Sequence, residues 1–256
     1  MLTFLLFRRV FKWIFRLILA FIAISLLWVV SYRFFNPPTT ALIQSREREY
    51  GTEALKEWVD YDQISDNLKL AVICGEDQRF KDHSGFDFKA IEKAIQHNIK
   101  SDKKRGASTI SQQTAKNVFL WESRSWIRKG LEVWFTVLIE ALWSKERILE
   151  VYLNIIELGP TEDQLYEYNS TDRISVNEQT SEESKKVHPI FGVEAAAQYY
   201  FKKSANALSK NQSAKLASIL PCPRSCGMNS SFAVHHRAFV LRCMRRWGKK
   251  IGRAHV

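Results

Sequence analysis

Two adjacent carboxylates stand at the end of an apolar helical run. In ICGEDQRFKDHSGFD, residues 73–87, Glu76 and Asp77 follow the run LKLAVIC and one glycine. A glutamate beside an apolar cleft is poised for proton transfer, because desolvation disfavours its charged form. A solvated charge at a helix end is the ordinary alternative. Asp77 is better placed to orient its neighbours, and His83, before a glycine turn, is more often a structural hydrogen-bonding group than a catalytic one.

The segment GASTISQQTAKN could bind an anion. Gly106 precedes a predicted helix, and Thr109 and Gln112 have the T-x-x-Q spacing of a capping box. Free backbone N–H groups at a helix start suit phosphate oxygens. Lys116, about two turns into the helix, can add an ammonium group, and Gln112 and Gln113 can donate to sugar or phosphate oxygens. A capped, solvated helix explains these residues equally well.

A third set of charges lies in RSWIRKGLEVWF. Arg128 and Glu132 are i,i+4 neighbours on one helical face, with Lys129 adjacent. Such pairs usually lie on the surface and contribute less than about 1 kcal/mol. This helix is heavily apolar, however, so most of its sides are covered and its few charges are expected to face a cleft. Glu140, near the end of the same helix, is interpreted as a structural charge.

Helical spacing dominates the elements that must position these residues. Ser65 and Asp87 are predicted helix caps, a long helix runs through WIRKGLEVWFTVLIEALW, and SKERILEVYLN forms another after a break at Ser144. Convincing alternating strands are absent. The expected fold class is therefore all-α.

The N-terminus is predicted to anchor the chain in a membrane. Four cations, Arg8, Arg9, Lys12 and Arg16, precede the apolar run LILAFIAISLLWVV. A cleaved signal peptide is the alternative, but no small-x-small cleavage site follows. The cations favour a cytoplasmic N-terminus and an exported body. We expect a cytoplasmic stub and transmembrane helix over 1–33, a linker over 34–50 and one domain over 51–256.

Charge and cysteines narrow the classes of ligand. The net charge of +11 favours anionic partners, and export argues against nucleic acid. Cys222 and Cys226 in PCPRSC are close enough to pair, with Cys243 nearby and Cys74 in a predicted helix. Together with His235 and His236 they match no usual zinc spacing, so a local disulfide or buried thiols are favoured over a metal site.

Residues 161–186 are acidic and polar, which predicts an exposed insertion.

Five motifs occur in order: GEDQRFKDHSGFD, RGASTISQQTAKN, RKGLE, SKERILEVYLN and FGVEAAAQYYFKK. Each is weak alone, but the series resembles the peptidoglycan glycosyltransferases of family 51. The N-terminal anchor and a body with no second domain after it resemble the monofunctional members. The resemblance implies an all-α, lysozyme-like fold and attachment to the bacterial inner membrane, with the catalytic domain in the periplasm. It also implies polymerisation of lipid II into glycan strands, with release of undecaprenyl diphosphate.

The resemblance also implies roles for individual residues. Glu76 matches the general base that takes a proton from the acceptor's 4-hydroxyl, and the reaction inverts the anomeric carbon. Glu132 matches the second glutamate, which helps the diphosphate depart directly or through a divalent cation, Mg²⁺ or Mn²⁺. No organic cofactor is expected. The implied diphosphate and substrate ligands are Lys116, Arg128, Lys129, Gln112, Gln113 and Thr109. The implied supporting residues are Asp77, Phe80, His83 and Asn117.

The expected partners are lipid II, the growing glycan, cytoplasmic membrane lipids, and proteins of wall synthesis or division. The insertion 161–186 departs from the family pattern, because it delays FGVEAAA after YLN.

Two other classes of protein stay open. A lysozyme-like hydrolase or lytic transglycosylase would need no diphosphate site, and the cations Lys116, Arg128 and Lys129 argue against it. A membrane-tethered scaffold with a degenerate site is disfavoured by the intact motifs.

Overall fold

The computed structural model describes residues 2–101, 106–123, 125–160 and 187–253. The helices of these ranges, in chain order, are α1 (Leu2–Phe34), α2 (Ala41–Tyr50), α3 (Asp66–Glu76), α4 (Phe88–Lys100), α5 (Ile110–Phe119), α6 (Trp126–Leu142), α7 (Lys145–Ile155), α9 (Val193–Phe201), α10 (Lys210–Ile219) and α11 (Ser231–Arg253). Short 3-10 turns cover Tyr61–Gln63 and Ala205–Ala207. The predominantly helical class predicted from the sequence is confirmed.

Several helices begin at residues whose side chains cap them. Ser65 accepts a hydrogen bond from the amide of Leu68, and Asp87 accepts one from the amide of Ala90. Such caps satisfy backbone donors that have no partner within the helix. The capping box predicted at the start of α5 is present with both of its hydrogen bonds. The sequence therefore located these helix starts correctly.

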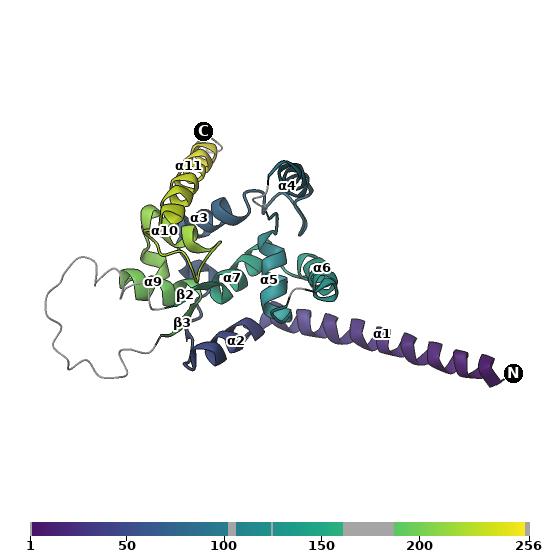
Figure 1. Ribbon diagram of the computed structural model, residues 1–256. Helices are drawn as coiled ribbons and strands as arrows, with labels where there is room; N and C mark the ends of the chain where they lie inside the picture. Colours follow the sequence, from purple (N-terminus) through teal and green to yellow (C-terminus); the bar gives the residue numbers. More distant parts are fainter. Residues whose placement is uncertain (1, 102–105, 124, 161–186, 254–256) are drawn as a thin grey trace.

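Two groups of helices build the body (Figure 1). Helix α3 packs against α10 and α11, while α5 packs against α6 and α7. Helix α7 lies deep in the core, where the side chains of Ile148, Tyr152 and Leu153 are fully buried. The first group carries Glu76 and the second carries Lys116 and Glu132. The candidate site residues therefore come from two separate packing units.

A small sheet joins segments that are far apart in the sequence. Its strands β1 (Leu55–Lys56), β2 (Glu157–Pro160) and β3 (Pro189–Phe191) have the order β1-β3-β2. Strand β3 pairs parallel with β1 and antiparallel with β2, and Pro160 lies opposite Pro189. The sequence analysis missed these strands because two to four residues are too few to show alternation. The predicted insertion 161–186 lies outside the described residues.

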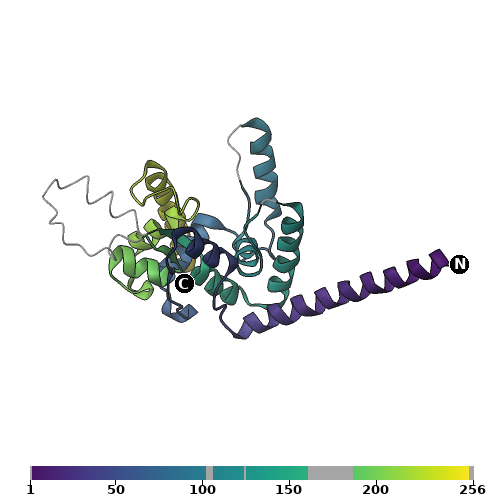
Figure 2. The same cartoon turned by 60° about the horizontal axis from the view of Figure 1, so that its bottom comes forward.

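Helix α1 is a candidate membrane span. Among the described residues one helix, over Phe7–Phe34, is long and apolar enough to cross a membrane. Its 28 residues would extend about 42 Å at 1.5 Å per residue, more than the hydrocarbon core of about 30 Å. The far end projects from the body, while the near end packs on α6 (Figure 2). There Trp134 donates to Ser25 Oγ at 3.1 Å and Trp143 donates to the Val29 carbonyl at 2.8 Å.

The linker expected over 34–50 contains the ordered helix α2. Its Arg46 is only 7% exposed, and its guanidinium donates to Glu157 and Glu122, both at 2.8 Å. Although desolvation opposes the charge, these carboxylates raise the pKa of Arg46 above its ordinary value. The sequence analysis missed this helix because its partners lie more than 70 residues away along the chain. Arg46 thus fixes the segment after the membrane span to the body.

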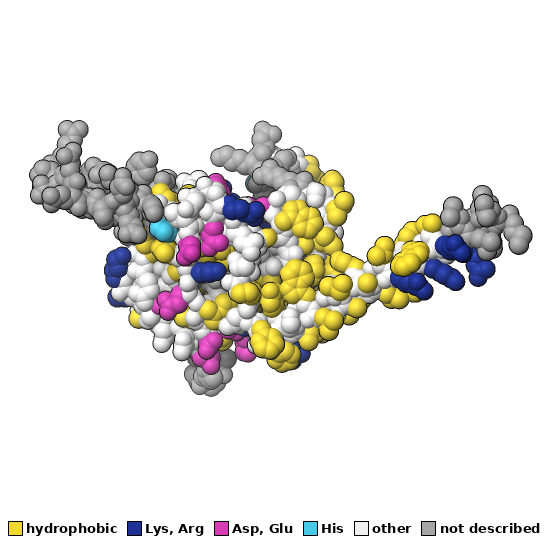
Figure 3. All heavy atoms as spheres, turned by 90° about the horizontal axis from the view of Figure 1, so that it is seen from below, with side chains coloured by type: hydrophobic (Ala, Val, Ile, Leu, Met, Phe, Trp, Pro, Cys, Tyr) yellow, Lys and Arg dark blue, Asp and Glu magenta, His cyan; other side chains and the backbone are white. Residues whose placement is uncertain are grey.

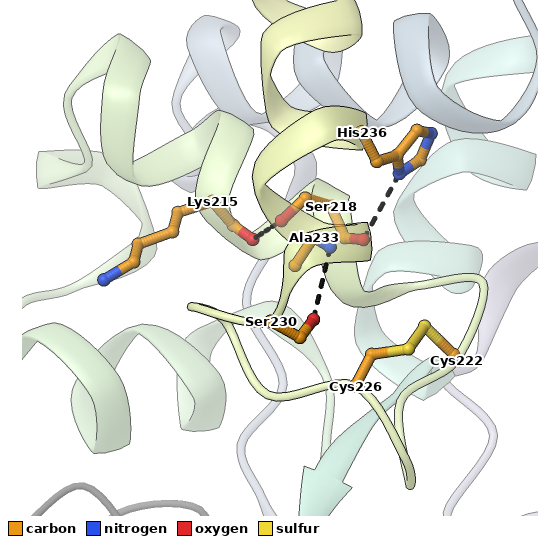
Figure 4. Close-up of a disulfide and its surroundings, with 7 residues drawn as sticks. All are labelled: Lys215, Ser218, Cys222, Cys226, Ser230, Ala233 and His236. Carbon is orange, nitrogen blue, oxygen red and sulfur yellow. Dashed lines mark hydrogen bonds between the residues drawn. A yellow bond between two sulfur atoms is a disulfide. The ribbon is translucent and has the colours of Figure 1, made fainter.

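All four cysteines form disulfides. Cys222 pairs with Cys226 in the turn before α11 (Figure 4), so of the two alternatives left open by the sequence, a local disulfide or buried thiols, the structure has the disulfide. Cys74 of α3 pairs with Cys243 of α11, a pairing that the sequence analysis did not propose. In Figure 4, His236 points its Nδ1 toward the Ser218 carbonyl, at 3.2 Å. No group of three or more His, Cys, Asp or Glu side chains suited to a metal ion occurs among the described residues.

Replacing Arg46 should destabilise the body. In Arg46→Ala, Glu157 is left buried without its cation, and the free energy of unfolding should fall by about 3 kcal/mol. Arg48→Ala, an exposed arginine on the same helix, is the matched control and should change it by less than about 0.5 kcal/mol. Urea unfolding of both variants measures the difference. Equal stabilities would show that α2 is not anchored by this ion pair.

Candidate active site

Glu76 lies at the last position of α3, half-buried beside a cleft. The cleft has a volume of about 820 Å³, and its charged or polar lining includes Glu76, Arg79, Lys89, Lys93, Thr109 and Gln113. Burial raises the pKa of Glu76 above its ordinary value, while the hydrogen bond from Gln113 and the charges of His236 and Lys116 oppose that rise. The raised pKa is the one proposed from the sequence for a proton acceptor, but the cleft is lined largely by polar and charged side chains and not by the apolar ones expected.

A chain of hydrogen bonds orients this carboxylate. Gln113 Nε2 donates to Glu76 Oε2 at 2.8 Å, and the hydroxyl of Tyr152 donates to Gln113 Oε1 at 3.2 Å. Since a phenol can satisfy the amide oxygen, the amide nitrogen is directed at the carboxylate. Tyr152 is fully buried on α7, and desolvation raises its pKa well above the ordinary value, so it remains a donor. Sequence analysis missed Tyr152, because its spacing predicts only a core position.

Asp77 and His83 form a buried support behind Glu76. His83 Nε2 lies 3.0 Å from both carboxylate oxygens of Asp77, and the amide of Ile110 donates to Asp77 at 3.1 Å. His83 Nδ1 is buried and has no hydrogen-bond partner among the described residues. Asp77 therefore caps the start of α5 from outside the helix. This arrangement agrees with an orienting rather than a reacting role for both residues.

The start of α5 differs from the expected phosphate site. Its first amide, that of Ile110, is already bound by Asp77, and Thr109 and Gln112 bond each other in the capping box. The Thr109 hydroxyl also donates to the Gly85 carbonyl at 2.6 Å. Gln112 is buried and does not line the cleft, whereas Gln113 does. The prediction of Gln112 as a substrate ligand thus conflicts with its position, because the capping box holds its side chain.

The remaining supporting residues lie in the core nearby. Phe80 is 1% exposed, and the ammonium of Lys145 lies 4.5 Å from the centre of its ring. Lys145 also donates to the His83 carbonyl and to Glu140, both at 2.7 Å, which supports the structural interpretation of Glu140. Asn117 is buried, and its Oδ1 has no partner among the described residues.

Glu132 forms the centre of the cationic cluster. Its carboxylate is 3% exposed and accepts from Arg128 Nη1 at 3.0 Å and from the ammonium of Lys129. Lys129 keeps 43% of its side chain exposed, so it can reach a ligand. The charge on Glu132 is compensated on both oxygens, as a buried carboxylate requires. The proposed i,i+4 pair is present and faces inward.

Lys116 lies within electrostatic reach of both this cluster and Glu76. Its side chain reaches solvent, but surrounding protein desolvates it and lowers its pKa, while Glu132 and Glu122 act in the opposite direction. Lys116 also acts on the charge of Glu76, so both glutamates lie within its electrostatic reach. A poorly hydrated ammonium is a strong ligand for a phosphate oxygen. The three cations Lys116, Arg128 and Lys129 therefore contribute to one region of positive electrostatic potential.

The donor set around Glu132 does not fit a metal ion held by the protein. Both of its oxygens are bound by Arg128 and Lys129, so a cation would have to displace one of them. Among the described residues no group of three or more Asp, Glu, His or Cys side chains lies there to complete a coordination shell. Positive side chains already supply the charge that a divalent ion would contribute.

Comparisons with known proteins agree with this geometry. The family model described as Transglycosylase matches residues 43–245. A biosynthetic peptidoglycan transglycosylase of Pseudomonas savastanoi pv. phaseolicola is 44% identical over 97% of this chain and 94% of its own length. Proteins of the same name from Bdellovibrio bacteriovorus and Pseudomonas aeruginosa are 46% and 44% identical, over 83% and 85% of this chain and 76% and 82% of their own lengths. The chain belongs to the transglycosylase family.

Proposed function

We propose that the chain polymerises lipid II into linear glycan strands and releases undecaprenyl diphosphate, as a peptidoglycan glycosyltransferase of cell wall synthesis. The observation that carries this proposal is that Glu76, a desolvated carboxylate, and Glu132 both lie within the electrostatic reach of Lys116. Such an arrangement can activate a hydroxyl at Glu76 and hold a diphosphate at the cations.

Glu76 takes the proton of the acceptor's 4-hydroxyl. A sugar hydroxyl is a poor nucleophile, and a carboxylate with a raised pKa is a better proton acceptor than an ordinary one. The acceptor oxygen forms a bond to the anomeric carbon of the donor chain. The bond from that carbon to the diphosphate oxygen breaks, and the electron pair leaves with the diphosphate. One displacement from the opposite face inverts the anomeric carbon.

The cationic cluster stabilises the departing diphosphate. Negative charge grows on its oxygen as the bond breaks, and Lys116, Arg128 and Lys129 supply positive charge there. Glu132 acts as a positioning residue, because it holds Arg128 and Lys129 on one side of α6. Fixed cations need no rearrangement during the reaction, so they stabilise the transition state more than mobile ions would.

The anchor places the enzyme at its lipid substrate. Helix α1 spans the bacterial inner membrane with its basic end, which carries Arg8, Arg9, Lys12 and Arg16, in the cytoplasm. The body then lies in the periplasm. The two disulfides support this orientation, since disulfides persist in oxidising compartments.

An apolar surface next to α1 is suited to membrane lipids. Figure 3 shows apolar side chains that continue from α1 onto the adjoining face of the body. The exposed apolar residues of α6 and the segment before it are Trp121, Trp126, Ile127, Val133 and Val137. Because α6 packs on the last turns of the span, this surface lies at the depth of the membrane interface. The diphosphate cluster on α6 is thereby brought to the level of lipid-linked substrates.

Replacing the base should abolish polymerisation. Glu76→Gln keeps the size of the side chain but removes the proton acceptor, so glycan synthesis from lipid II should fall at least about 100-fold. Glu132→Gln releases Arg128 and Lys129 and should also impair synthesis. Gel analysis of lysozyme-digestible polymer measures both, with Glu57→Gln, an exposed glutamate on another segment, as control. Full polymerisation by Glu76→Gln would refute its role.

Removing the hydroxyl of Tyr152 should change the pH dependence. In Tyr152→Phe the Gln113 amide is free to turn its oxygen toward Glu76, which raises the pKa of Glu76 further. Activity needs the ionised carboxylate and is lost as pH falls through that pKa. The acidic limb of kcat/KM should therefore move to higher pH, with about a five-fold loss near neutral pH.

The matched control for this variant is Tyr200→Phe, which also loses one tyrosine hydrogen bond, to the Leu158 carbonyl. Its acidic limb should stay where the parent's lies. A general loss of activity in Tyr152→Phe with an unshifted limb would mean that Tyr152 acts only through packing.

The orientation can be tested with protease added outside spheroplasts. The body should be digested while the N-terminal stub is protected, because only the former lies outside the membrane. Detection of tags at both ends of the chain distinguishes the two. Protection of the body would contradict the proposed topology.

A further inference from the structure

A second depression adjoins the catalytic cleft. It has a volume of about 630 Å³, and it shares Gln78, Arg79 and Phe239 with the lining of the cleft that contains Glu76. Its other walls come from Asp82 and from α11, which packs beside α3 (Figure 1). The mechanism described above uses none of these residues. The two hollows adjoin each other at these shared residues, so a ligand held at Glu76 lies next to the second one.

The depression is rich in guanidinium groups. Arg242 and Arg246 are exposed on α11 and form no ion pair with the described residues, while Arg79 is paired with Asp87 at 2.7 Å. Asp82 is the one carboxylate in the described lining, so three cations face one anion. Arginine binds carboxylates through two parallel hydrogen bonds. The carboxylate of Asp82 can bind an amino group on the same ligand.

The depression also has apolar walls and a fixed floor. Phe239, which is 40% exposed, and Trp247 line it, so it suits a ligand with apolar as well as charged parts. Cys243 lies at its floor and is bonded to Cys74, two residues before Glu76. This disulfide fixes α11 to the helix that carries the base. The distance between the arginines and Glu76 is therefore set by a covalent link.

We propose that this depression, which we name the arginine pocket (Arg79, Asp82, Phe239, Arg242, Arg246 and Trp247), binds the stem peptide of the substrate through its carboxylates. The inference rests on the proposed function, since it concerns the sugar-peptide unit whose sugar lies at Glu76. The structure disfavours a lipid headgroup as the ligand, because α11 and the projecting span α1 lie on opposite sides of the body (Figures 1 and 2). Peptide carboxylates are the anions that a substrate in the neighbouring cleft brings with it.

Steady-state kinetics with two substrates tests the arginine pocket. One substrate is lipid II, and the other is lipid II whose peptide carboxylates are converted to neutral amides. For the parent chain, KM should be about five-fold higher for the amidated substrate, with kcat unchanged. Arg242→Gln and Arg246→Gln should each raise KM for ordinary lipid II by about the same factor. The double variant should no longer distinguish the two substrates.

Arg245→Gln is the matched control. It removes the same charge from an exposed position on the same helix, outside the lining of the pocket, and its KM values should equal those of the parent. Discrimination that persists in the double variant would overturn the proposal, as would an equal effect of Arg245→Gln. Absence of polymer from the parent chain would instead overturn the proposed function.

Sedimentation with phosphatidylglycerol vesicles separates lipid headgroups from peptide. The proposal predicts equal vesicle binding by the parent and by the double variant Arg242→Gln/Arg246→Gln. Weaker vesicle binding by that variant, together with unchanged discrimination between the substrates, would assign the pocket to anionic lipid.

Discussion

The active site depends on the buried carboxylate of Asp77. It accepts from the amide of Ile110 and contacts His83, so it joins the end of α3 to the start of α5. These helices belong to different packing groups, and this junction, together with the hydrogen bond from Gln113 to Glu76, sets how the two helices meet. A carboxylate is suited to this position, because its oxygens can accept several hydrogen bonds and neutralise the positive end of a helix dipole.

Desolvation shifts the two ends of the site in opposite directions. It raises the pKa of Glu76 and lowers that of Lys116, so the charged form of each group is less stable than it would be in water. In the proposed reaction an acceptor hydroxyl at Glu76 and a donor diphosphate at Lys116 relieve both costs. Glu132 shows the contrasting solution, in which a buried charge is fully compensated by Arg128 and Lys129 and is therefore suited to positioning.

The sequence predicted local features well and distant ones poorly. Helix caps such as Ser65 and Thr109 depend on residues three positions away, and the Arg128–Glu132 pair depends on one turn, so spacing alone reveals them. The hydrogen bond of Tyr152 to Gln113, the ion pair of Arg46 with Glu157 and the Cys74–Cys243 bond each join residues that are at least 39 positions apart. No periodicity encodes such contacts, and for the same reason the sequence could not decide between an anion site and a capped helix at the start of α5, where Asp77 binds the first amide.

The pairing of Pro160 with Pro189 has a consequence for how the fold can vary. Residues 160 and 189, which residues 161–188 connect, are partners in the pairing of β2 with β3. The closure entropy of a connection between neighbouring ends grows only slowly with its length. A reporter or a foreign domain can therefore be inserted at this junction, because the polymerising core folds through contacts of its own.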